Sequence, residues 1–157
     1  MNYLIDANNL AGAMDILDDP NFDELLIETM ENFNTDKQRS IFLVFDGIDN
    51  MGDKYNAKNN VVVIRSPRDD HYKTADDKII EMFHNNECGN EPIIVTDDIE
   101  LKNSIKKISE SMSIKVTLIQ ATDFAARLKE PNYQNSDKIL SQKSKQKIND
   151  ELLDLWT

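Results

Sequence analysis

Acidic side chains stand at the edges of four short segments that are spread along the chain. Three of these segments are apolar runs that end on an acid, and the fourth has the pattern of a helix start. Carboxylate oxygens are the ligands that hard cations such as Mg²⁺ and Mn²⁺ prefer, and these cations activate water for phosphate-ester hydrolysis. The pattern therefore indicates a metal site for phosphodiester hydrolysis. The acids concerned are Asp6, Asp46, Asp76, Asp77, Asp97 and Asp98.

The apolar runs predict the elements that position these acids. Each run is short and continuous, as in strands that are buried on both faces of a parallel sheet. Segments with apolar residues at helical spacing separate most of the runs, which predicts a doubly wound α/β fold with right-handed crossovers. The polar stretch 48–60 is the exception, and we expect a surface loop there. The five predicted strands span 3–6, 41–45, 61–64, 93–95 and 115–119.

The predicted strands deliver most of the acids to one place. Ligands of doubly wound folds collect beyond the carboxyl ends of the strands, where Asp6, Asp46 and the pair Asp97 and Asp98 fall. Asp76 and Asp77 lie in the first turn of a predicted helix, where the helix dipole stabilises anions. Carboxylates gathered in this way raise one another's pKa, and a bound cation relieves the repulsion. Asn9 can orient an acid or a phosphate through its side-chain amide.

Each acid also has a purely structural interpretation. An Asp after a strand often forms only a turn or caps a helix. This interpretation is strongest for Asp97 and for Asp77, which follows Thr74 by three residues, as in a capping box. Thr96 is a further candidate cap, and its hydroxyl can also reach a phosphate or a metal-bound water. What favours a site is the coincidence of four segments at one edge.

Composition narrows the class of protein. A chain of 157 residues suffices for one domain with a buried core. The single cysteine, Cys88, excludes an internal disulfide and a cysteine-rich zinc site. No apolar run reaches the length of a membrane span, so we expect a soluble, cytoplasmic protein without a membrane partner. The net charge of -11 argues against tight, sequence-independent nucleic-acid binding, which needs a basic surface.

The composition changes near residue 130, where a lysine-rich segment begins. We therefore expect a folded domain over 1–130 and a C-terminal tail over 131–157. The tail is predicted to end in a short helix that packs on the domain or on a partner. The apolar face of that helix is formed by Ile148, Leu152, Leu155 and Trp156.

Four motifs resemble those of the NYN-type, PIN-like ribonucleases, and they occur in that family's order. YLIDANNL resembles the opening motif LIDGNN, LVFDG the second-strand motif, TADDKI the helix-start motif, and VTDDIEL the motif V-T-S-D-x-x-L. The resemblance is closest to the YacP-like branch and covers roughly 2–129; the tail helix is also similar. It implies a three-layer PIN-like fold with a five-stranded parallel sheet in the order 3-2-1-4-5. It also implies an endoribonuclease that hydrolyses phosphodiester bonds of single-stranded RNA with Mg²⁺ or Mn²⁺.

The resemblance assigns roles to individual residues. It implies that Asp6, Asp76 and Asp98 bind the metal. Asp98 rather than Asp97 corresponds to the family's aspartate, because Asp97 takes the place of the usual serine. Ala7 replaces the glycine of the opening motif, which stiffens the turn. The residues implied to support the metal, its water or the phosphate are Asp46, Asp77 and Asn9.

A basic loop precedes Asp76 and can contact RNA locally, although the protein as a whole is acidic. Its cations can contact the RNA backbone, and its tyrosine can stack on a base. The alternative is a solvated loop whose charges cancel against Asp69 and Asp70. The candidate RNA contacts are Arg65, Arg68, Tyr72 and Lys73, with His71 beside them.

Other functions use similar acids. A non-catalytic module that binds RNA or the ribosome keeps the fold and the acids without cutting. A phosphorylation-receiver domain expects a lysine after its last strand, where this chain has Ile119 and Gln120. A metal-dependent DNA 5′-nuclease usually needs a longer chain. The expected partners of the ribonuclease are single-stranded RNA and a ribosome carrying its mRNA, and we expect a monomer or a homodimer.

Overall fold

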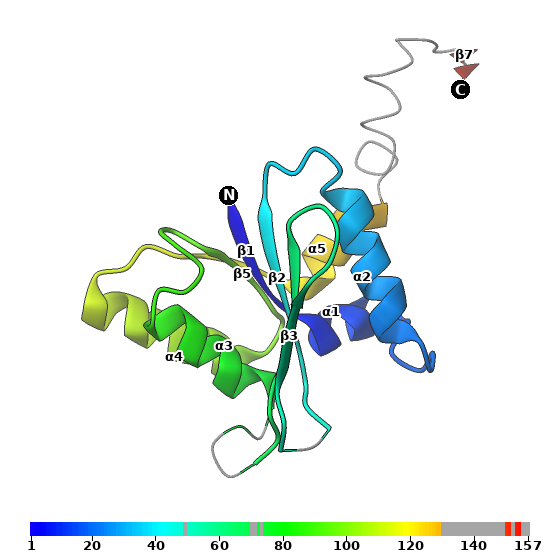
Figure 1. Cartoon of the computed structure of the whole chain (residues 1–157). Helices are drawn as coiled ribbons and strands as arrows, with labels where there is room; N and C mark the ends of the chain where they lie inside the picture. Colours follow the sequence, from blue (N-terminus) through cyan, green and yellow to red (C-terminus); the bar gives the residue numbers. More distant parts are fainter. Residues whose placement is uncertain (49, 70–71, 73, 130–149, 152, 155–157) are drawn as a thin grey trace. The chain divides into compact units, whose positions relative to one another are not determined.

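Short apolar runs form the central sheet, as the sequence predicts (Figure 1). The computed structural model describes residues 1–48, 50–69, 72, 74–129, 150–151 and 153–154. Most residues of strands β1, β2, β4 and β5 are buried, which is why these strands are apolar except at their ends. The strands of this sheet are β1 (Asn2–Asp6), β2 (Ser40–Phe45), β3 (Asp53–Asn56), β4 (Val61–Arg65), β5 (Ile93–Val95) and β6 (Thr117–Ile119).

The sheet has the strand order β3-β4-β2-β1-β5-β6. The central strand β1 pairs in parallel with β2 and β5, and β4 and β6 continue the parallel pairing outward. These five strands lie in the predicted order. At one edge β3 pairs antiparallel with β4. The prediction of a wholly parallel, five-stranded sheet is therefore wrong, because the sheet is mixed and has six strands.

Strand β3 lies inside the stretch 48–60, which was expected to be a loop. All four of its residues are exposed. An edge strand that pairs on one side and packs against nothing needs no apolar face, so it leaves no apolar pattern in the sequence.

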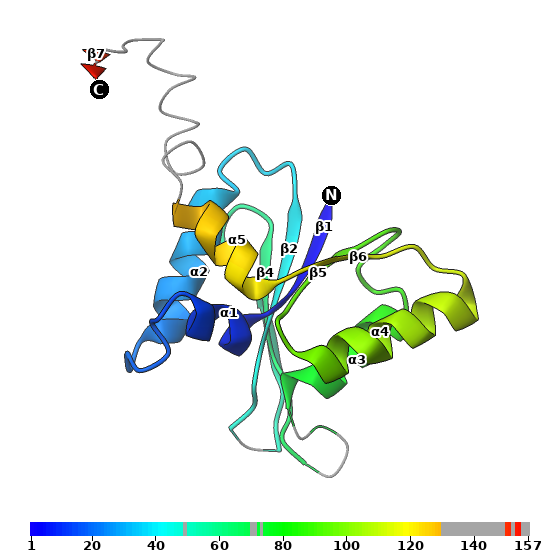
Figure 2. The same ribbon diagram turned by 180° about the vertical axis from the view of Figure 1, so that it is seen from behind.

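Helices cover both faces of the sheet (Figures 1 and 2). Helices α3 and α4 lie on one face and α1 and α2 on the other. The first helix ends at Ala13, and Asp15 shortly after it has a left-handed conformation. The helices are α1 (Ala7–Ala13), α2 (Phe22–Phe33), α3 (Ala75–His84), α4 (Ile99–Met112) and α5 (Ala121–Lys129).

Alternate residues of β1 pack into the core on opposite faces of the sheet. Leu4 packs with Ile79 of α3 and Ile105 of α4. Tyr3 points the other way, where its ring contacts the rings of Phe33 and Phe124. Burial on both sides fixes the register of β1, because a slip by one residue would exchange the two faces. Asp6, the last residue of this strand, is thereby fixed as well.

Residues 126–157 form a second unit, separate from 1–125. Its described strands, β7 (Asp150–Glu151) and β8 (Leu153–Asp154), pair in parallel. The four apolar residues of the predicted tail helix lie outside the described residues, and the described residues between them form strands rather than a helix. Packing of the tail on the domain or on a partner stays a prediction. Among the described residues, no helix is both long and apolar enough to cross a membrane.

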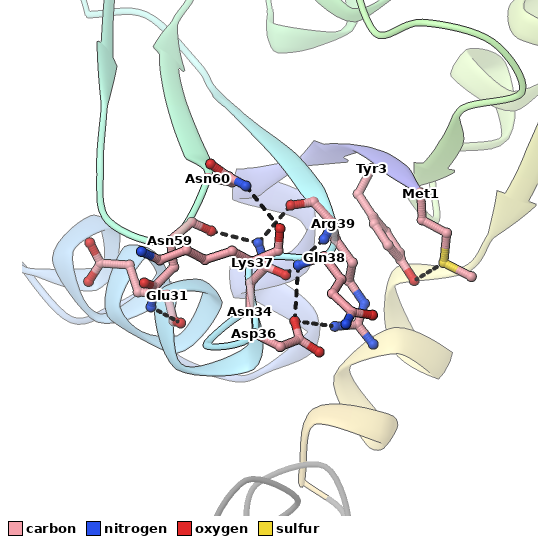
Figure 3. Close-up of polar contacts among 10 residues, drawn as sticks. All are labelled: Met1, Tyr3, Glu31, Asn34, Asp36, Lys37, Gln38, Arg39, Asn59 and Asn60. Atoms are coloured by element: carbon pink, nitrogen blue, oxygen red, sulfur yellow. Dashed lines mark hydrogen bonds and ion pairs between the residues drawn. The ribbon is translucent and has the colours of Figure 1, made fainter.

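A buried amide holds the amino edge of the sheet together (Figure 3). Asn34, which is fully buried, donates from Nδ2 to the carbonyl oxygens of Arg39 and Asn59 at 2.8 and 2.6 Å. The backbone N–H of Arg39 donates to Asn34 Oδ1 at 3.2 Å. One side chain thus joins the end of α2, the start of β2 and the turn between β3 and β4.

We predict that Asn34→Ala destabilises the protein by about 2 to 4 kcal/mol, because it leaves several buried polar groups without partners. The free energy of unfolding from urea denaturation measures this loss. Gln38→Ala, at an exposed position of the same turn, should cost less than about 0.5 kcal/mol. Equal losses for the two variants would contradict a special role of the buried amide.

Candidate functional site

The carboxyl edge of the sheet brings acids from separate motifs together. Asp6 is the last residue of β1, and the strands on either side of β1 lead to Asp46 and Asp98. Asp76 lies in the first turn of α3. The charges of Asp46 and Asp98 raise the pKa of both Asp6 and Asp76, which shows that the four carboxylates are electrostatic neighbours. We refer to these four residues as the acidic cluster.

Asp6 is the most deeply buried member of the acidic cluster, with 5% of its surface exposed. Burial raises its pKa to about 6, and the charges of Asp46 and Asp98 add to the rise. A hydrogen bond from the Thr96 hydroxyl to Asp6 Oδ2, at 3.1 Å, acts in the opposite direction. A carboxylate at this position is therefore held in place but is poorly stabilised as an anion.

Asp76 carries the larger perturbation. Partial burial raises its pKa to about 8, followed by the charge of Asp6 and by a hydrogen bond with the Asp98 carboxyl. Asp76 and Asp98 are thus close enough to share a proton. Two carboxyl groups that interact in this way favour either a proton or a cation between them.

Thr96 connects two acids of the cluster. Its hydroxyl donates to Asp6 and accepts the backbone N–H of Asp98 at 3.0 Å. Asp98 in turn caps α4, because its Oδ1 accepts the N–H of Leu101 at 3.0 Å. Thr96 is fully buried, so this bridge is shielded from water. Sequence reasoning treated Thr96 as a cap and missed the connection; its place directly after a buried strand was the available signal.

Two neighbouring asparagines in α1 fix the loops on either side of β1. Asn8 Oδ1 accepts the backbone N–H of Asp46 at 2.9 Å, and Asn9 Oδ1 accepts that of Asp97 at 2.7 Å. The first turn of α1 therefore holds the loop after β2 with one side chain and the loop after β5 with the other. Asn9 was predicted to orient an acid or a phosphate, and it holds the backbone next to Asp98. The part played by Asn8 was not predicted.

Asp46 ties the end of β2 to the start of α3. Its Oδ1 accepts the backbone N–H of Ala75 at 2.7 Å, while its side chain is otherwise exposed. This bond fixes the position of the residue that follows, Asp76. The structure thus gives Asp46 a positioning contact in addition to its charge.

Asp77 is the helix cap that the sequence suggested, whereas the cap interpretation of Asp97 is wrong for the helix that follows it, because Asp98 is the N-cap of α4. Asp77 and Thr74 form a capping box at the start of α3. Asp97 accepts both the hydroxyl and the backbone N–H of Thr122, at 2.6 and 3.2 Å. Asp97 therefore connects the loop after β5 to α5, whereas its neighbour Asp98 faces the acidic cluster.

Two of the predicted RNA contacts are engaged within the protein. Arg65 forms an ion pair with Asp23 at 2.9 Å. The hydroxyl of Tyr72 donates to Glu81 at 2.6 Å, and the ammonium group of Lys78 lies 5.6 Å from the centre of its ring. Arg65 thus connects β4 to α2, and Tyr72 connects its loop to α3. Of the remaining candidates, Arg68 is exposed, and Lys73 and the neighbouring His71 lie outside the described residues.

The donor set of the cluster suits a hard cation without forming a closed cage. Among the described residues, no three His, Cys, Asp or Glu side chains form a group that could hold a metal ion as they stand. The ion pairs formed between described residues do not include any acid of the cluster. Mg²⁺ is usually held by one or two carboxylates and completes its shell with water and substrate phosphate. A pair such as Asp76 and Asp98 meets that requirement.

Comparison with known proteins identifies the family. The model of the YacP-like NYN domain matches residues 3–157. The chain therefore belongs to the YacP-like NYN domain family, whose members are generally nuclease-like proteins that act on RNA. Comparisons with curated proteins and with solved structures gave no significant match.

We predict that Asp76→Asn stabilises the metal-free protein at pH 7.5 by about 1 to 3 kcal/mol, a range reduced for the partial exposure of this side chain. The folded-state pKa of Asp76, about 8, exceeds the ordinary value of 3.8. The contribution of Asp76 to the free energy of unfolding is therefore fully present below about pH 4, and it is lost as the pH rises toward 8. The gain should vanish at pH 3.5, below the ordinary pKa, in urea denaturation. Asp53→Asn, on exposed β3, should be neutral at both pH values, and a loss of stability in Asp76→Asn at pH 7.5 would contradict the repulsion.

We also predict that substitutions of the two adjacent aspartates affect different properties, stability for Asp97 and the response to Mn²⁺ for Asp98. Asp97→Ala removes two hydrogen bonds and should lower stability by about 1 to 2 kcal/mol, while Mn²⁺ still raises the melting temperature. Asp98→Asn keeps a good helix cap and should preserve the fold but lose the response to Mn²⁺. Thermal unfolding with and without Mn²⁺ measures both. The assignment of Asp98 fails if the two variants exchange these behaviours.

Proposed function

We propose that this protein is a metal-dependent endoribonuclease that hydrolyses phosphodiester bonds of single-stranded RNA. The observation that carries the proposal is the contact of Asp76 with Asp98 beside buried Asp6, three carboxylates brought from three segments to one edge of the sheet. Membership of a nuclease-like family supports it. A cluster of this kind costs stability unless a cation occupies it, so its presence favours a function that uses the cation.

The proposed ligands of Mg²⁺ or Mn²⁺ are Asp6, Asp76 and Asp98. When bound, the cation supplies charge neutralisation at the phosphate and an acidified water for attack. Asp46 holds the helix start that carries Asp76, through the N–H of Ala75. Thr96 holds Asp6 and Asp98 relative to each other. The ligands are thus fixed by bonds to backbone groups and to a buried hydroxyl, and the electrostatic environment is set before substrate arrives.

The remaining predicted residues take supporting roles in this proposal. Asn9 keeps the loop of Asp98 in place through the N–H of Asp97. Asp77 stabilises the first turn of α3 through the capping box. Both act on the position of the ligands, so their removal should weaken activity less than removal of a ligand. A ribosomal partner, a cytoplasmic location and the oligomeric state stay predictions.

A second candidate is a module that binds RNA or the ribosome without cutting. It is favoured by the open arrangement of the acids and by the engagement of Arg65 and Tyr72 within the protein. Such a module would bind its partner equally well after neutralisation of Asp76, whereas a nuclease would lose its reaction.

Incubation of the purified protein with Mn²⁺ and single-stranded RNA tests the proposal. We expect cleavage by the parent protein and at least a hundredfold lower rate in Asp6→Asn and Asp76→Asn, because each loses a charged ligand. Asp53→Asn serves as the matched control and should cleave at the parental rate. Cleavage that persists in both ligand variants would assign the activity to a contaminant, and a parent that does not cleave would favour the binding module.

A further inference from the structure

Two large aliphatic side chains stand exposed next to acids of the cluster. Ile48, two residues after Asp46, is 88% exposed, and Ile99, directly after Asp98, is 69% exposed. Single exposed aliphatic residues are common on proteins. These two differ because each belongs to the segment that delivers an acid to the cluster.

The loop that carries Ile48 is anchored on both sides of it. A Cβ atom on Gly47 would lie 1.8 Å from the carbonyl oxygen of Ser66, so only glycine permits this approach. Further along the loop, a Cβ on Gly52 would lie 3.0 Å from the ring of Pro67. Ile48 is therefore presented from an anchored loop at the carboxyl edge.

Ile99 is presented from the other side of the cluster. It is the first residue of α4, and the helix start is fixed by the bond from Leu101 to Asp98. Strands β2 and β5 flank β1, so the segments that carry Ile48 and Ile99 leave the sheet on opposite sides of Asp6. A chain that crosses the acidic cluster would meet one isoleucine before it and the other after it.

The charges near the cluster disfavour recognition through phosphates. Arg65 and Lys78 are paired with Asp23 and Glu81, and the whole chain carries a net charge of -11. The bases of single-stranded RNA, in contrast, offer flat faces that stack on aromatic side chains and also pack against other apolar ones, and these contacts do not require positive charge. An acidic protein can therefore gain affinity for RNA through the bases.

We propose that Ile48 and Ile99 contact the bases on either side of the phosphodiester that lies at the acidic cluster. This inference rests on the proposed function, since it takes single-stranded RNA as the substrate. The two isoleucines would determine where the RNA strand lies and would make binding depend on bases rather than on phosphate charge. The dependence of affinity on salt should then be shallow, equivalent to about three phosphate contacts or fewer.

The test measures fluorescence anisotropy of two oligonucleotides of about twelve nucleotides, one with all its bases and one with abasic riboses at its centre. All proteins carry Asp76→Asn, so that the RNA stays intact. The parent should bind the complete RNA about tenfold more tightly than the abasic one. Ile48→Ser/Ile99→Ser should lose that preference. Met112→Ser, which removes an exposed side chain at the other end of α4, should retain it.

Three results would overturn the inference: no measurable RNA binding by the parent, an unchanged preference in the double variant, or an equal loss of affinity for both oligonucleotides. The last would show that the isoleucines contact a part of the RNA that both oligonucleotides share, such as the sugar–phosphate backbone, rather than the central bases. Cleavage by the Asp76-containing proteins separates the two proposals. If the protein with Asp76 cleaves RNA in Mn²⁺, and Ile48→Ser/Ile99→Ser binds and cleaves RNA as efficiently as it does, the proposed base contacts are wrong and the proposed ribonuclease activity stands. If base binding depends on the isoleucines but the protein with Asp76 does not cleave RNA, the proposed ribonuclease activity is wrong.

Discussion

The site is governed by the cost of keeping carboxylates charged where the fold buries them and brings them close together. Asp6 is buried at the end of the central strand, and Asp76 and Asp98 meet beside it. The pKa values of Asp6 and Asp76 are raised because burial and neighbouring charges both penalise the anions. A fold selected for stability alone would replace at least one of these acids with a neutral side chain, as natural proteins retain such costs mainly where function requires them. The cluster is therefore best understood as a place for positive charge.

Hydrogen bonds from neighbouring residues hold the acids in place despite this loss of stability. Asn8 and Asn9 secure the loops on both sides of β1, Asp46 secures the start of α3, and Thr96 joins Asp6 to the backbone of Asp98. Most of these contacts use side-chain oxygens to bind backbone N–H groups, so they position the segments without adding positive charge. The carboxylates remain available to a cation, and their spacing is determined by the sheet and by the helix starts.

The sequence predicts much of this architecture because burial leaves a clear pattern. The apolar runs of β1, β2, β4 and β5 are visible because both of their faces are covered, and the acids at their ends follow from the direction of parallel strands. Strand β3 could not be predicted, since DKYN is exposed throughout and pairs only through its backbone. The family motif separates Asp98 from Asp97, but the partner of Asp97 could not be predicted, because Thr122 lies 25 residues further along the chain. The bonds of Asn8 and of Thr96 join segments far apart in the chain, and spacing along the sequence does not reveal them.

Membership of the YacP-like NYN family and the geometry of the acids lead to one central claim, that a divalent cation is held by Asp6, Asp76 and Asp98. A crystal of the full chain soaked in Mn²⁺ tests it most directly, because anomalous scattering locates the ion without reference to activity. The account predicts an anomalous peak about 2 to 2.5 Å from carboxylate oxygens of these residues, with water in the remaining positions. Absence of a peak at millimolar Mn²⁺, or a peak bound elsewhere on the protein, would contradict it.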